Sequence, residues 1–304
     1  MRLFYCLLLF LFFTQGDIHA QAESELLTTA VKEYSLKEYA KSAETYSKVI
    51  AINNQNLSAY FNRGLCYFRT EDYTKAIADF SIVIAKNSND IDAINYRAQS
   101  YQWAQQYAQA LSDFNKLLEL KPNSTPALYN RGLTNYYLSN YKEAISDFTF
   151  VIKNNPGDAE AYLTRGICYL ETGEHQKALS DLFVAEKKLI NSPQIEYNIG
   201  LVYFEMKEYN NALPRIKKSL ELDSNQPKAN FILGFIHAHN KNTALAIQSF
   251  STTIKQDPNY RDAYYYRGLS YLELYKNELA CIDFKKALAL KHPDAQNQLT
   301  KNCL

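Results

Sequence analysis

The sequence has little glycine, proline or cysteine and no excess of either charge. Its 304 residues include 9 glycines, 8 prolines and 5 cysteines, and 33 basic residues offset 32 acidic ones. Proteins that bind nucleic acid normally carry a strong basic excess or a basic stripe. The net charge of +1 and the lack of any such Lys/Arg run therefore argue against nucleic acid as a partner.

Residue patterns typical of catalysis and of metal binding are also missing. No CxxC or Cys/His spacing suggests a zinc site, and His237 and His239 would face different ways on a helix. The chain has no glycine-rich phosphate loop and no Ser/His/Asp or Cys/His arrangement that its spacing would bring together. The sequence therefore predicts a protein that is not an enzyme and holds no metal or cofactor.

Long hydrophobic runs are confined to the N-terminus. Arg2 precedes an unbroken run of 11 apolar residues, Leu3–Phe13, and the small residues Ala20 and Ala22 follow. This order is typical of a secretory signal peptide with an A-x-A cleavage site. As a helix the run would rise about 16 Å, too little to cross a bilayer core of about 30 Å. We expect residues 1–22 to be a signal peptide and the mature chain to be periplasmic or secreted, without a membrane span. An uncleaved membrane tether is the alternative.

Residues 23–294 repeat one pattern eight times, with a period of 34 residues and no insertion. The units are residues 23–56, 57–90, 91–124, 125–158, 159–192, 193–226, 227–260 and 261–294. Counting positions from the start of each unit, position eight is always glycine or alanine, and position twenty is alanine in all units but the first, which has Ser42. A fixed period of this length indicates a solenoid, whose units must stack to bury their apolar faces.

Each unit reads as two helices. In the second unit, Tyr60, Gly64 and Phe68 lie at helical spacing, residues 69–72 form a polar break, and a second apolar stripe begins at Tyr73. Small residues at positions eight and twenty would let the two helices approach closely. We expect large rings at positions seventeen and twenty-four to fill the space between hairpins. After the last unit, residues 295–304 are expected to form a short capping helix.

These positions resemble the tetratricopeptide repeat family, whose pattern is an aromatic residue or Leu followed by L-G, Y, A, F, A and P. The resemblance covers all eight units. It departs from the family pattern at position seven, which is mostly Arg instead of Leu, and in the first unit, where Ala30 replaces glycine as in a terminal capping repeat. The resemblance implies an all-α, right-handed superhelical solenoid of eight helix-turn-helix repeats, with ligands bound by the first helices on the concave face.

Two residue types vary together across the units. The five units with Arg at position seven are also the five with Asp at position twenty-three, and units six and seven lack both. Because the two positions lie opposite each other in an antiparallel hairpin, we expect an ion pair in each of the five hairpins, partly shielded by the stack. The predicted pairs are Arg63 with Asp79, Arg97 with Asp113, Arg131 with Asp147, Arg165 with Asp181, and Arg267 with Asp283.

Four cysteines follow the N-terminal run. Cys66 and Cys168 share position ten but lie three units apart, too far to bridge in a stacked array. Cys281 and Cys303 are near enough in sequence to approach at the C-terminal end. Small apolar fillers between helices are nevertheless the interpretation that we favour for all four.

The family resemblance places positions two, five, six, nine, twelve and thirteen on the ligand-binding groove. Here these positions carry aromatic and aliphatic residues, with Asn at position six in alternate units, as in the asparagine ladders of some peptide-binding repeats. The predicted groove residues are Phe61, Asn62, Leu65, Tyr129, Asn130, Leu133, Tyr136, Tyr197, Asn198, Leu201, Phe231, Tyr265 and Leu269.

We therefore predict a non-enzymatic protein–protein interaction scaffold that binds an extended peptide or a partner helix in this groove. The Lys and Asn residues with which some family members grip a C-terminal carboxylate are missing from positions five and nine, so that function is excluded. The alternative is an envelope accessory protein that binds carbohydrate or lipid through a face rich in tyrosine, of which the chain has 25.

Overall fold

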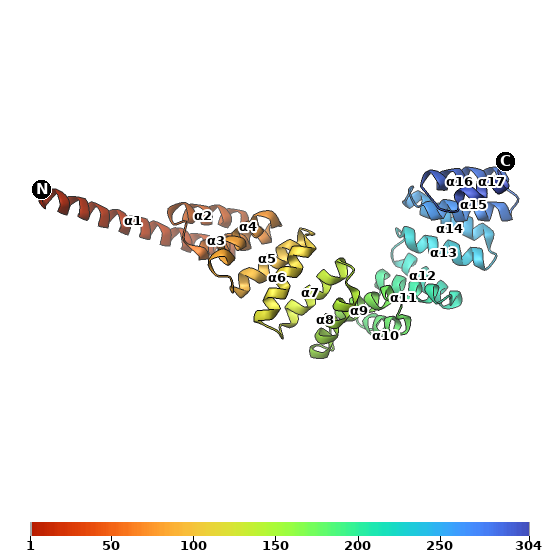
Figure 1. Cartoon of the computed structure of the whole chain (residues 1–304), viewed down its shortest axis with the longest axis horizontal. Helices are drawn as coiled ribbons and strands as arrows, with labels where there is room; N and C mark the ends of the chain where they lie inside the picture. The colour runs from red at the N-terminus through yellow and green to blue at the C-terminus, as the bar shows by residue number, and fades with distance from the viewer. Residues whose placement is uncertain (1, 304) are drawn as a thin grey trace. The chain divides into compact units, whose positions relative to one another are not determined.

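The computed structural model describes residues 2–303, with side chains from residue 19 onward, so the side chains of the predicted leader before that point lie outside the described residues. The described chain consists of α-helices and short connections (Figure 1). It divides into two compact units, each made of several repeats: the first unit ends at Pro156 and the second unit begins at Gly157. From here on, each 34-residue segment is called a repeat.

The helices pair in chain order as antiparallel hairpins, which confirms the predicted all-α repeat architecture. The first unit contains α1(Arg2–Ser35), α2(Tyr39–Ile52), α3(Leu57–Arg69), α4(Tyr73–Lys86), α5(Ile91–Trp103), α6(Tyr107–Leu120), α7(Thr125–Tyr137) and α8(Tyr141–Asn154). The second unit contains α9(Ala159–Glu171), α10(His175–Glu186), α11(Pro193–Glu205), α12(Tyr209–Leu222), α13(Pro227–His239), α14(Thr243–Gln256), α15(Arg261–Glu273), α16(Asn277–Ala289) and α17(Ala295–Asn302).

The first helix of each repeat from the second onward begins at position one, and in repeats two to six the residue before it is a side-chain N-cap. The side chains of Asn56, Asp90 and Asp158 accept hydrogen bonds of 2.9, 3.0 and 3.0 Å from the backbone N–H three residues later. Ser124 and Ser192 make the same contact at 3.4 Å. These caps satisfy N–H groups that a helix start leaves without a partner.

The turn inside every hairpin places position fifteen in the left-handed region. Seven of these residues are not glycine, with φ between 59° and 63°, and the eighth is Gly173 with φ 75°. In each turn the next residue's N–H donates to the carbonyl of position eleven, as in the bond of 2.9 Å from Asp72 N to Tyr67 O. The backbone therefore repeats one turn geometry although the side chains at this position vary.

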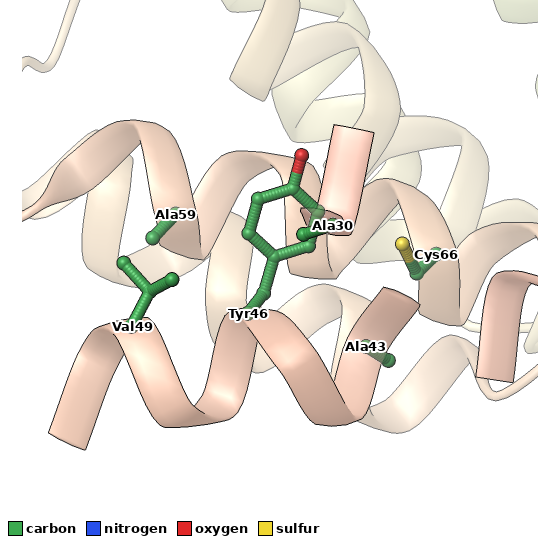
Figure 2. Close-up of a cluster of buried hydrophobic side chains, with 6 residues drawn as sticks. All are labelled: Ala30, Ala43, Tyr46, Val49, Ala59 and Cys66. Carbon is green, nitrogen blue, oxygen red and sulfur yellow. The ribbon is translucent and has the colours of Figure 1, made fainter. Parts of the chain in front are cut away.

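Within each hairpin, position eight lies against position twenty-four. Figure 2 shows the first case, where the Tyr46 ring of α2 lies beside Ala30 of α1 and Val49 points toward Ala59 of α3. At the tightest glycines, a Cβ on Gly234 or Gly268 would lie 2.7 Å from the ring of Phe250 or Phe284, both fully buried. The small residues at position eight are therefore required by the approach of the second helix.

The C-terminal cap corrects the interpretation of two cysteines. Cys281 of α16 and Cys303, directly after α17, form a disulfide with a Cα–Cα distance of 5.7 Å, so they are not apolar fillers. Cys66 and Cys168 are buried free thiols, and burial raises the pKa of Cys168 to about 12. The predicted capping helix is present as α17, and the disulfide joins it to the last repeat.

Among the described residues, no helix carries an apolar stretch long enough to cross a membrane. The helix that contains the predicted cleavage site runs without a break from Arg2 to Ser35. Glu23, the first residue after that site, accepts hydrogen bonds of 3.1 and 2.6 Å from the side-chain amides of Asn53 and Asn56. The residue that cleavage would leave at the N-terminus thus contacts the end of the first repeat.

Candidate functional site

In the second unit, five aromatic rings from three successive repeats come together. Phe204 of α11 packs on Phe235 of α13 with ring centroids 5.2 Å apart, and Phe235 packs on Tyr266 of α15 at 5.3 Å. Phe231 lies 5.7 Å from Tyr266, and Tyr209 lies 6.2 Å from Phe235. We call these five residues the aromatic cluster. Its members on the first helices occupy positions five, six, nine and twelve, which all belong to the predicted groove.

The aromatic cluster borders an open cavity of about 500 Å³, which Glu205, Lys207, Asp262 and His292 also line. The carboxylate-bearing side chains of Glu205 and Asp262 are 44% and 41% exposed, so both carboxylates reach solvent at the cavity. They come from positions thirteen and two of repeats six and eight. Stacking of the repeats thus brings acidic residues from two repeats to the same cavity as the rings.

The charge of this cavity is predominantly negative at neutral pH. His292 Nε2 lies 3.5 Å from Asp262 Oδ1, and burial lowers the pKa of His292, which keeps its imidazole uncharged beside the carboxylate. Burial, followed by the neighbouring Tyr265, Asp262 and Asp294, raises the pKa of Tyr266. Lys207 is the basic side chain among the lining residues, and it is exposed.

Of the thirteen predicted groove residues, Phe231 alone lines this cavity, and twelve of the thirteen are half-buried. The rings at position five pack largely on their own hairpins. Phe61 lies 5.6 Å from the Phe80 ring, Tyr129 lies 5.7 Å from the Phe148 ring, and Tyr265 stacks on His292 at 4.0 Å. These three rings therefore contact their own hairpins and are only partly exposed.

Two of the three asparagines at position six, Asn62 and Asn198, use their side-chain amides within their own helices. The amides of Asn62 and Asn198 donate to the carbonyls of Ser58 and Gln194, at 2.9 and 2.8 Å. Asn198 is only 5% exposed, so it offers little surface to a ligand. The backbone carbonyl of Asn130 accepts from the Gln102 amide at 3.2 Å. Asn62 and Phe61 line a separate cavity of about 300 Å³ in the first unit.

The Arg and Asp residues that vary together lie face to face in all five hairpins. Each guanidinium donates to both carboxylate oxygens through Nε and Nη2, at distances between 2.7 and 2.9 Å. Nη1 also donates to the preceding repeat, as from Arg63 to Ser47 at 3.1 Å and from Arg131 to Asn115 at 3.0 Å. The arginine therefore joins two successive hairpins. The joint occurrence of Arg and Asp along the sequence did not indicate this second contact.

Repeat six lacks this pair and has a different one, in which the arginine lies on the second helix of the hairpin. Arg215 stands at position twenty-three, where other repeats have Asp, and its Nη1 pairs with Glu196 at 3.0 Å and with Glu186 of the preceding repeat. The neighbouring Pro214 lies inside α12, which nevertheless runs from Tyr209 to Leu222. A half-buried charged contact is thus retained, with the arginine on the second helix of the hairpin instead of the first.

Sequence reasoning missed two exposed aromatic residues of the first unit. Trp103, the single tryptophan of the chain, and Tyr137 are 63% and 54% exposed. They stack on Tyr73 and Tyr107 of the preceding repeat, with ring centroids 6.3 and 4.8 Å apart. The signal was available, because positions thirteen and seventeen face each other between repeats. Among the side chains from residue 19 onward, no group of His, Cys, Asp and Glu could hold a metal ion.

Comparison with protein families agrees with this geometry. Tetratricopeptide repeat models match residues 58–90, 92–124, 129–193 and 197–261, and a TPR repeat model matches residues 32–71. The chain belongs to the tetratricopeptide repeat family. This fold serves in general as a non-enzymatic scaffold for protein–protein interaction, so its expected partners are proteins. No curated protein matches the chain in sequence.

Solved structures similar to this tetratricopeptide repeat protein share its fold at low identity. A chain of the APC/C hetero-tetramer Cut9–Hcn1 matches with a TM-score of 0.62 and 17% identity over 92% of this chain and 55% of its own. The chain thus spans about half the length of that relative. A tetratricopeptide repeat protein from Parabacteroides merdae matches with 0.58 and 20% over 93% and 100%. PilF from Pseudomonas aeruginosa matches with 0.60 and 18% over 71% and 100%. At these identities the likeness establishes the fold alone.

Proposed function

We propose that this protein is an exported scaffold that binds an extended peptide segment of a partner protein along the first helices of its second unit. The observation that carries the proposal is the open cavity of about 500 Å³ bordered by the aromatic cluster. Partly exposed rings supply the apolar anchor sites on which protein interfaces concentrate their binding free energy. The cavity sits at groove positions that come from three repeats, so an extended chain could contact all three.

The chemistry around the cavity favours binding over reaction. Its polar groups are two carboxylates, two tyrosine hydroxyls, one ammonium group and an uncharged imidazole, and none is a serine or cysteine nucleophile activated by a base. Binding requires only that the partner bury the exposed parts of the rings and pair with the carboxylates. A scaffold function therefore accounts for the residues of the cavity without a catalytic step.

Export is supported by two separate features. The N-terminal layout of Arg2, Leu3–Phe13 and Ala20-Gln21-Ala22 is typical of a cleaved leader. The Cys281–Cys303 disulfide is of the kind that persists in oxidising compartments. The intact mass of the protein isolated from its native cells tests this part: cleavage after Ala22 would leave Glu23 as the first residue, and a mass that retains residues 1–22 would refute it.

The groove function is tested by site-specific photocrosslinking of the full-length protein in its native cells. A photoreactive phenylalanine analogue at Tyr209, a half-buried residue lining the cavity, should give a discrete adduct that maps to one peptide segment of a protein. The matched control places the analogue at Tyr107 of the first unit, the same repeat position outside the cavity. A glycan or lipid adduct at Tyr209, or equal adducts at both positions, would contradict the proposal.

A further inference from the structure

The cavity of the second unit combines aromatic rings with carboxylates, and this combination has a specific chemical meaning. A cation over an aromatic face is attracted by the negative potential of the ring, most strongly where water is excluded. Glu205 and Asp262 reach the same cavity from two different repeats. A ligand group that suits both features must carry a positive charge and have flat surfaces that pack on rings.

The protein itself already holds such a group with the same set of partners. In repeat two, the Arg63 guanidinium is 2.8 Å from both carboxylate oxygens of Asp79 and lies 5.5 and 5.8 Å from the ring centroids of Tyr60 and Tyr67. The Arg267 guanidinium is held in the same way between Tyr264 and Tyr271, at 5.7 and 5.9 Å. Aromatic faces with a carboxylate are therefore the environment in which this fold accommodates arginine.

We propose that the cavity binds an arginine side chain of the partner's peptide, with the guanidinium packed on the aromatic cluster and paired with Glu205 and Asp262. This inference rests on the proposed peptide-binding function and specifies the chemistry of the partner. Arginine fits better than lysine, because its guanidinium is planar, weakly hydrated and able to bond a carboxylate through two N–H groups. A lysine ammonium ion is a strongly hydrated point charge that matches the rings less well.

The charges nearby are consistent with this occupant. The histidine next to Asp262 is kept uncharged by burial, so it does not neutralise the carboxylate at pH 7. Arg261 lies 3.5 Å from Asp262, but its side chain is 51% exposed, and such a pair is strongly screened by water. Lys207 is likewise exposed at the edge of the cavity. His175 Nε2 also lies 3.1 Å from Glu205 Oε2, and both Arg261 and His292 contact Asp262 at Oδ1. These contacts leave one oxygen of each carboxylate, Glu205 Oε1 and Asp262 Oδ2, to an incoming guanidinium.

The test selects peptides from a phage-displayed library of random dodecapeptides on the full mature protein. We expect enriched peptides to share an arginine at one aligned position. Each peptide is then synthesised with arginine, lysine or citrulline there, since citrulline keeps the shape of arginine without its charge. Citrulline should weaken binding at least about tenfold, the loss expected for a partly desolvated cation–π and carboxylate contact. Raising the salt concentration should weaken the arginine peptide more than the citrulline peptide.

Two variants of the protein complete the test. The double substitution Glu205→Gln with Asp262→Asn should weaken the arginine peptide about tenfold, whereas Glu221→Gln with Glu278→Gln, which removes the same charge from exposed positions elsewhere, should leave it unchanged. Lys207→Glu adds a carboxylate at the cavity edge and should tighten binding of the arginine peptide. Tighter binding by the Lys207→Glu variant shows that its site is folded, which keeps the test valid where the double substitution disturbs folding.

The outcomes separate this inference from the proposed function. Peptides that bind and compete with one another but tolerate citrulline, or that are insensitive to Lys207→Glu, would overturn the arginine assignment and leave peptide binding in place. A library that yields no peptide whose binding responds to any cavity variant would overturn both.

Discussion

Arg63 and Asp79 are joined by two parallel hydrogen bonds of 2.8 Å, and the same guanidinium donates a third, of 3.1 Å, to Ser47 in the preceding repeat. The Asp79 side chain is 3% exposed. Hydrogen bonding to Asp79 raises the pKa of Arg63, and burial raises the pKa of Asp79. Removing the arginine would thus leave a carboxylate in a position where its charge is costly.

The pair Arg131–Asp147 provides the test of this arrangement. Its side chains are 27% and 4% exposed, and the two N–O distances are 2.9 and 2.7 Å. In a double-mutant cycle of Arg131→Leu and Asp147→Asn, we expect a coupling free energy of about 1–3 kcal/mol. The exposed pair Lys116–Glu119 is the control and should give about 0–1 kcal/mol. Additive effects at Arg131 and Asp147, measured by urea unfolding, would contradict the structural role.

The glycines at position eight should differ in how well they tolerate alanine. A Cβ on Gly234 would lie 2.7 Å from the Phe250 ring, whereas one on Gly132 would lie 3.1 Å from the Phe148 ring. We expect Gly234→Ala to lower the free energy of unfolding by about 1–3 kcal/mol, because overpacking outweighs the better helix propensity of alanine. Gly132→Ala should lower the free energy of unfolding less, and thermal unfolding of both variants measures the difference. A stabilised Gly234→Ala variant would show that the helices separate easily.

His237 should make the second unit sensitive to mild acid. Its Nδ1 is the buried side-chain atom without a hydrogen-bond partner among the described residues, and burial, then Lys217, lowers its pKa. The folded state thus binds fewer protons than the unfolded state between its lowered pKa and the ordinary histidine pKa of about 6.5. Stability from this group is therefore complete above that pH and is lost as pH falls through it.

The measurement is urea unfolding at several pH values between about 5 and 8, compared between the wild type and His237→Tyr. Five other repeats carry tyrosine at position eleven, so the variant should fold. We expect it to have a shallower decline of stability in acid, with the remainder due in part to His292, whose pKa burial also lowers. Equal declines in the two proteins would exclude His237 as a source of the pH dependence.

The Cys281–Cys303 disulfide should hold α17 on the last repeat. It closes a loop with a sequence separation of 22, and constraining such a loop stabilises the folded state by about 3 kcal/mol. We expect reductant to speed amide exchange in 295–302 in the wild type, but to have no further effect in Cys303→Ser, which already lacks the bond. Alkylation of both cysteines in denatured, unreduced protein would show that the bond is absent.

Much of the fold could be predicted because every repeat folds into the same helical hairpin. The apolar spacing located both helices of every unit, and glycine at position eight indicated a close helix crossing that the Gly268–Phe284 contact now explains. The Arg and Asp pattern located five ion pairs before their distances were known. The turns were less visible, since left-handed residues such as Lys207 and Tyr275 are not glycine and carry no sequence signal.

The candidate site was predicted only in part. Phe231 was selected as a groove residue, and Phe204, Phe235 and Tyr266 stand at predicted groove positions, whereas Tyr209 at position seventeen was expected to fill the space between hairpins. Periodicity could not tell which rings at these positions border an open cavity. Tyr129 and Phe61 show the difficulty, since their rings also lie against Phe148 and Phe80 of their own hairpins. Cys281 and Cys303 form a disulfide because α17 folds back on α16, and the spacing of the two cysteines in the sequence did not reveal this.

The amino-acid sequence by itself determined the repeat, the helices and their pairing, because these depend on contacts at a fixed short separation that every unit repeats. The tertiary structure alone decided which aromatic faces stay open and which charges surround them. Those properties depend on how side chains from three successive repeats share the same space, and a one-dimensional pattern does not specify that volume. Glu205 and Asp262, far apart in the sequence, line a single cavity for this reason.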